Sequence, residues 1–127
     1  MAKLPAPAAV LFVSDVALLS DFYRQVAAMA IVHAEADHVV MELQGFQLVI
    51  HKLGGGWDAQ PGSVSVRDDS YIKLCLPVVS IDVARRIADS LGGSIKSTDH
   101  EWQARGFRAC DGHDPEGNVF QVRESVA

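Results

Sequence analysis

Five residues of this 127-residue chain have side chains suited to holding a metal ion or a small molecule. The imidazole of a histidine and the amide oxygen of a glutamine can coordinate a cation, and an arginine can pair with an anionic group. A tryptophan in a polar neighbourhood can form the lid or wall of a pocket for an aromatic or amphipathic ligand. These candidates are His51, Gln121, Arg123, Trp57 and Trp102. No residue is assigned a catalytic role.

The stretch that carries two of these candidates reads DGHDPEGNVFQVRE, residues 111–124. Pro115 fixes φ at the second position of a turn, and the Asp114 side chain can bond back to the turn amides. Gly117 can adopt the left-handed conformation that leads into a strand. A calcium loop is excluded, because a register with Gly117 at its sixth position places Arg123 at the position that requires a carboxylate. The stretch therefore predicts a tight turn followed by a strand carrying Gln121 and Arg123.

The rest of the chain predicts a repeated order of elements, namely a strand, a helix and three strands. Ser14 or Asp15 can cap the first helix, and Ser80 can cap the second, where Val83, Ile87 and Leu91 form an apolar stripe. The expected helices are 16–27 and 81–91, and the expected strands are 8–13, 30–36, 38–43, 46–53, 71–78, 93–98, 106–112 and 118–125. Aligning the two halves places His51 over Arg123 on matching strand faces.

Composition excludes several classes of function. The net charge of -5 argues against nucleic-acid and anionic-membrane partners, since both need clustered Lys and Arg. No stretch predicts a transmembrane helix or a cleaved signal peptide, so a cytoplasmic protein is expected. Cys75 and Cys110 lie in apolar segments and are expected to be buried free thiols.

Three local patterns resemble the vicinal oxygen chelate superfamily, which includes glyoxalases, bleomycin- and fosfomycin-resistance proteins and extradiol dioxygenases. They are VLFVSDVALLSDFYRQV, LPVVSIDVARRIADSLGG and DPEGNVFQVRE, and together they extend over residues 8–125. The resemblance implies an α+β fold in which two βαβββ modules curl mixed sheets around a cavity. The single domain, 1–127, would comprise module one (about 8–53), a linker (54–69) and module two (about 70–125).

In metal-dependent members of the superfamily, the first and last strands of each module supply the metal ligands. The matching positions in this chain are Ala8, Val49, Lys73 and Gln121. Alanine and valine cannot coordinate a cation, lysine must first lose its proton, and glutamine supplies only a neutral oxygen. No metal and no other cofactor is therefore expected at these positions. Lys73 joins the candidate ligand-binding residues because it occupies one of them.

The resemblance favours a metal-independent protein that binds a small molecule, and a homodimer. The alternative is a lyase, isomerase or dioxygenase with a divalent metal displaced to His51, together with Gln121. If the protein is an enzyme, the resemblance implies a glyoxalase-type lyase or an extradiol-type dioxygenase. A third reading is a module with a filled cavity that serves protein association.

Overall fold

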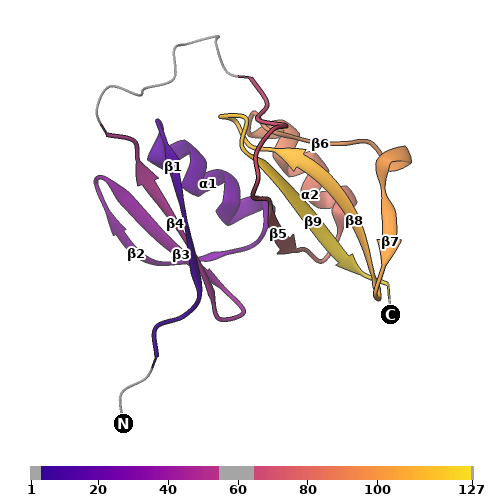
Figure 1. The fold of residues 1–127 in the computed structure, drawn as a ribbon, viewed down its shortest axis with the longest axis horizontal. Helices are drawn as coiled ribbons and strands as arrows, with labels where there is room; N and C mark the ends of the chain where they lie inside the picture. The colour runs from indigo at the N-terminus through magenta and orange to yellow at the C-terminus, as the bar shows by residue number, and fades with distance from the viewer. Residues whose placement is uncertain (1–3, 55–64, 127) are drawn as a thin grey trace.

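The computed structural model describes residues 4–54 and 65–126, and it confirms an α+β fold with a repeated unit (Figure 1). Each unit begins with a strand and a helix and continues with antiparallel strands. The first unit contains β1 (Ala8–Val13), α1 (Val16–Val26), β2 (Ala30–Glu35), β3 (His38–Leu43) and β4 (Phe46–Lys52).

The strands observed in the second unit differ in number and length from the strands predicted there. It contains β5 (Leu74–Pro77), α2 (Ile81–Ser90), β6 (Ser94–Ile95), η1 (Thr98–His100), β7 (Trp102–Ala104), β8 (Phe107–His113) and β9 (Val119–Ser125). The strand predicted at 93–98 is wrong in length, because the 3₁₀ turn η1 redirects the chain after β6. The chain then returns beside β8 as β7, a strand that the sequence did not predict.

Each unit forms its own mixed sheet, and within residues 4–54 and 65–126 no ladder joins the two sheets. Sheet one has the strand order β1-β4-β3-β2, and sheet two has the order β5-β9-β8-β6, with β7 also paired to β8. The first strand of each unit runs parallel to the last strand, and the remaining pairs are antiparallel. β1 and β5 are therefore each one edge strand of their sheet, opposite the edges formed by β2 and β6, and they lie at the junction of the two units (Figure 1).

Side chains along β3, β4, β8 and β9 alternate between a face that packs on a helix and a face that does not. The helix-packed face supplies the core residues Val39, Met41, Leu48, Ile50, Cys110, Phe120 and Val122. We call the opposite faces the open face of sheet one and the open face of sheet two. Cys110 is buried as expected, but the expectation for Cys75 is wrong, because it lies on the open face of sheet two and is exposed.

Both helices begin at predicted caps. Asp15 accepts a hydrogen bond from the Leu18 amide (3.0 Å), and Ser80 accepts one from the Val83 amide (3.2 Å). The stripe predicted for α2 is partly wrong, since Val83 is exposed and the buried residues are Ile81, Ala84 and Ala88. Small alanine side chains allow close packing of this helix. No helix in the described ranges has the length and apolar character needed to cross a membrane.

The turn before β9 has the predicted conformation and also joins the two units. Gly117 has φ +85°, and Asp114 accepts hydrogen bonds from the Glu116 and Asn118 amides. The fully buried Asp114 carboxylate also accepts a bond of 2.7 Å from the Tyr23 hydroxyl of α1. Burial raises the pKa of Asp114, whereas the hydrogen bonds from Tyr23 and Asn118 act in the opposite direction.

The neighbouring Glu116 carboxylate holds the start of α1. Its oxygens accept bonds of 2.8 Å from the Ser14 amide and 2.8 Å from the Asp15 amide. A negative charge is favourable at a helix N-terminus, where backbone amides lack partners. Glu124 does the same within the second unit, accepting a bond of 2.7 Å from the Ile81 amide at the start of α2. The start of each helix is thus bound by a glutamate from the second unit.

The Tyr23–Asp114 bond should stabilise the junction measurably. Tyr23→Phe removes one donor from a buried carboxylate, so we expect the free energy of unfolding to fall by about 1–3 kcal/mol. Urea denaturation measures this loss. Tyr71→Phe is the matched control, since Tyr71 is fully exposed, and it should leave stability unchanged. Equal stability of Tyr23→Phe and the wild type would contradict the role given to this bond.

Candidate functional site

Four of the predicted ligand-binding residues gather on the open face of sheet two. Gln121 and Arg123 lie on β9, and Trp102 lies on β7. Lys73 precedes β5 and reaches β8 through its ammonium group. His51 lies instead on β4, on the open face of sheet one. Trp57 lies outside the described residues.

The predicted polar residues of sheet two are linked by a carboxylate, Asp111, that is not among the predicted site residues. Lys73 Nζ lies 3.0 Å from Asp111 Oδ2, and Gln121 Nε2 donates to Asp111 Oδ1 over 3.1 Å. Arg123 Nε donates to Gln121 Oε1 over 2.7 Å. Both polar atoms of the Gln121 amide are therefore occupied within the protein. We call these four residues the sheet-two network.

Asp111 stays ionised within this network. Burial alone would raise its pKa, but the hydrogen bonds from Gln121 and Lys73 and the nearby charges of Lys73 and Lys96 lower it below its ordinary value. The carboxylate therefore remains a charged acceptor at neutral pH. Hairpin register could have identified it, because Asp111 lies directly opposite Gln121 across the predicted turn.

An aromatic surface borders the network on one side. The Arg123 guanidinium lies 4.4 Å from the centre of the Phe107 ring, a cation–π geometry. Trp102 packs edge-on against the same ring, with centroids 6.1 Å apart. Trp102 is 43% exposed, so part of its indole remains available for contact. The open face of sheet two thus combines charged groups with an accessible aromatic edge.

A polar cavity of about 420 Å³ opens over the other end of the network. Two lysines, Lys73 and Lys96, line it together with Asp111 and His113. The segment that leads into β5 covers one side through Val66, Asp68 and Ser70. Its volume falls within the range of small-molecule sites in proteins.

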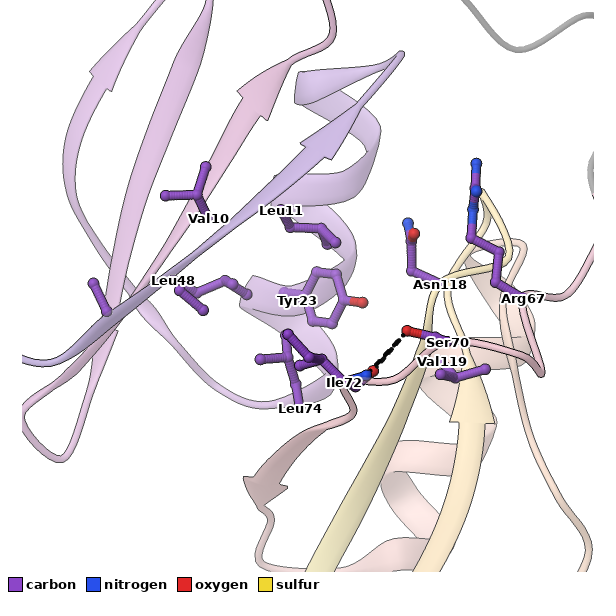
Figure 2. Close-up of a pocket in the computed structure, with 12 residues that line it drawn as sticks. Val10, Leu11, Tyr23, Leu48, Arg67, Ser70, Ile72, Leu74, Asn118 and Val119 are labelled. Carbon is purple, nitrogen blue, oxygen red and sulfur yellow. Dashed lines mark hydrogen bonds between the residues drawn. The ribbon is translucent and has the colours of Figure 1, made fainter. Parts of the chain in front are cut away.

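A second cavity, of about 410 Å³, lies between the two units and was not predicted from the sequence. Figure 2 shows Leu11, Leu48 and Tyr23 of the first unit on one side, and Ile72 and Leu74 of the second unit on the other. Arg67, Ser70 and Asn118 supply its polar groups. Among the residues singled out in the sequence that the structure describes, only Ala8 contributes to its lining.

The two cavities adjoin, because Ser70 and Val119 line both. One cavity is bordered mainly by aliphatic and aromatic side chains, and the other by ammonium and carboxylate groups. This arrangement suits a molecule with an apolar part and a charged part. The polar residues of the two cavities come from segments far apart in the sequence, which is why local patterns did not reveal them.

His51 belongs to a row of rings on the open face of sheet one. Its ring stacks on His38 with centroids 5.6 Å apart and an interplanar angle of 12°. Phe12 packs on the other side, also at 5.6 Å. Of the pair predicted for a displaced metal, His51 and Gln121, each residue lies on a different sheet, and the Gln121 amide is hydrogen-bonded to Asp111 and Arg123. Ala8 and Val49 lie on this same face of sheet one, and neither offers a ligand atom.

Comparisons with known proteins agree with this architecture. No curated protein matches the chain in sequence. A glyoxalase/bleomycin resistance protein/dioxygenase family enzyme from Burkholderia phytofirmans has a similar structure, with a TM-score of 0.67 and 14% identity over 94% of this chain and 97% of that one. An integron cassette protein from V. cholerae gives a TM-score of 0.61 and 22% identity over 98% and 97% of the two chains.

A variant of the fosfomycin resistance protein FosX from Listeria monocytogenes is also similar, with a TM-score of 0.65 and 13% identity over 99% of this chain and 93% of that one. That structure holds Mn(II) and 1S,2S-dihydroxypropylphosphonic acid. At these identities the likeness shows the fold alone. The family model for the glyoxalase-like domain matches residues 8–123. This chain is therefore a member of the glyoxalase-like domain family, within the vicinal oxygen chelate superfamily.

Proposed function

We propose that this protein binds a small amphipathic molecule without a metal ion, on the open face of sheet two and in the cavity next to it. The observation that carries the proposal is the sheet-two network, which occupies two of the four superfamily metal positions. At those positions Lys73 and Gln121 already bond to Asp111, and Arg123 bonds to Gln121.

The network disfavours a cation at the superfamily position for two reasons. A metal ion would need the Gln121 oxygen, which already accepts a charge-assisted bond from Arg123. It would also lie beside the positive charges of Lys73 and Arg123, which repel it, while the single carboxylate of Asp111 is shared with Lys73. Metal-dependent lyase, isomerase or dioxygenase chemistry through Gln121 therefore has less support than metal-free binding.

The adjoining cavities define the class of ligand. Leu11, Leu48 and Leu74 offer apolar contact between the units, and Lys73 and Lys96 offer positive charge in the polar cavity. A small organic acid with an alkyl or aryl group fits both parts. Trp102 and Phe107 could pack against an aryl group that extends along the sheet.

We further propose a homodimer in which sheet one of one protomer covers sheet two of its partner. Val10 and Phe12 on the open face of sheet one are 52% and 56% exposed, and neighbouring apolar side chains of this kind mark interaction surfaces. Covering the binding face would exclude water from the ligand. Analytical ultracentrifugation checks the assembly, and we expect Phe12→Asp to be monomeric where the wild type is dimeric. A wild-type monomer at micromolar concentration would contradict this arrangement.

Lys73 should control the ionisation of Asp111. Because the folded-state pKa of Asp111 is lowered, ionised Asp111 stabilises the fold above its unfolded-state pKa, and this contribution is lost as the pH falls through the folded value. In Lys73→Met we expect the Asp111 pKa to rise toward or above 3.8, its ordinary value. Carbon-detected NMR titration measures it. Lys52→Met, an exposed lysine on sheet one, is the control and should leave the Asp111 pKa unchanged.

Ligand binding is tested by thermal shift with octanoate and 3-phenylpropionate, in the presence of a chelator. A ligand at a hundredfold its dissociation constant adds about 2.7 kcal/mol, which raises the melting temperature by several degrees. We expect the shift to shrink in the double variant Lys73→Met/Lys96→Met and to persist in Lys52→Met. If neither acid raises the melting temperature of the wild type, or if the double variant responds fully, the proposed ligand class is wrong.

A further inference from the structure

We propose that His33, Glu35 and His38 form a binding site for a divalent transition-metal ion, specifically zinc, on the open face of sheet one. The ligand atoms of these three side chains lie within 4.8 Å of one another. Two imidazoles and one carboxylate form a donor set that zinc accepts, with a fourth coordination position left open. The site goes beyond the proposed function. It lies on the other sheet and uses none of the four superfamily positions.

The geometry leaves room for an ion between the three side chains. Glu35 Oε2 lies 3.8 Å from His33 Nε2 and 3.6 Å from His38 Nε2. Both separations exceed a hydrogen bond, so the atoms face one another without a direct bond. Tetrahedral zinc with bonds of about 2.0–2.1 Å places neighbouring ligand atoms about 3.3–3.4 Å apart. Small side-chain rotations bring the three atoms to that separation.

A bulge in β2 brings two of the ligands to this face. Ala30 lies opposite Glu42 and Ile31 opposite Met41, but the register then shifts so that His33 lies opposite Val40. Without the shift, strict alternation would turn the side chains at 33 and 35 toward the face that packs on α1. With it, His33 and Glu35 share the open face with His38, which lies opposite Glu35. A bulge of this kind redirects side chains.

His38 is held in the tautomer that a metal needs. Its Nδ1 lies 2.8 Å from Asp37 Oδ1, within hydrogen-bond distance. An ionised carboxylate only accepts, so Nδ1 carries the proton and Nε2 offers its lone pair toward Glu35. A carboxylate behind a histidine ligand fixes the ring and raises its basicity. Stacking on His51 further restricts the ring.

Isothermal titration of the chelator-treated full chain with zinc chloride tests the site. We expect one equivalent of zinc per chain. His33→Ala and Glu35→Gln each remove a ligand and should each weaken zinc binding by tenfold or more. Asp37→Asn removes the carboxylate that supports His38 and should weaken zinc binding by about 10–100-fold. These three residues are exposed and lie in the β2–β3 hairpin, and the circular dichroism spectrum of each apo variant verifies its fold.

His100→Ala is the matched control. His100 and His33 have similar side-chain exposure, 57% and 54%, and each lies 3.8 Å from a carboxylate oxygen. This variant should bind zinc as the wild type does. Cobalt(II) provides a second readout, since its visible absorption reports coordination by the protein and should disappear in Glu35→Gln. No zinc binding, or equal weakening by His100→Ala and His33→Ala, would overturn the proposal.

Discussion

The arrangement of the two units depends on the carboxylates of one turn. Asp114 and Glu116 come from the turn before β9, yet they bind Tyr23 on α1 and the amides at the start of α1. These bonds place β1 beside the segment that enters β5, and the apolar cavity lies between them. Hydrophobic contact alone would permit sliding, whereas a buried carboxylate with several donors permits one arrangement. The geometry of the candidate binding site therefore follows from a turn that does not itself line the polar cavity.

The repeat, and the strand that carries two of the candidate site residues, were accessible from the sequence. Alternation along 118–125 correctly places Gln121 and Arg123 on one face, because the turn at Pro115 and Gly117 fixes where the strand begins. Asp111 was missed because its partner is set by hairpin register and not by a local motif. The spacing of apolar residues identifies the strands and helices. This spacing does not indicate which polar side chains will form hydrogen bonds or ion pairs with one another.

Other features could not be predicted, for physical reasons that differ from case to case. The bulge after Ile31 depends on pairing with β3, so nothing in the local pattern around His33 indicates which face that residue takes. The volume of the inter-unit cavity depends on the distance between the apolar surface of the first unit and that of the second, which the sequence does not specify. The apolar stripe predicted for α2 includes Val83, but the helix buries Ala84 and Ala88 instead, because small side chains allow a helix to pack closely on its neighbour. In each case long-range packing overrode a local signal.

The bonds that join the two units have a consequence for assembly. Tyr23 to Asp114 and Ser14 to Glu116 link residues 91 and 102 positions apart, and neither bond requires that both partners belong to one chain. Two copies could exchange their first units and form the same bonds between chains, as in domain swapping. The choice between the closed and exchanged forms then depends on the effective concentration set by the connection between β4 and β5. Shortening that connection would favour exchange, while the bonds from Tyr23 to Asp114 and from Ser14 to Glu116 could form in either arrangement.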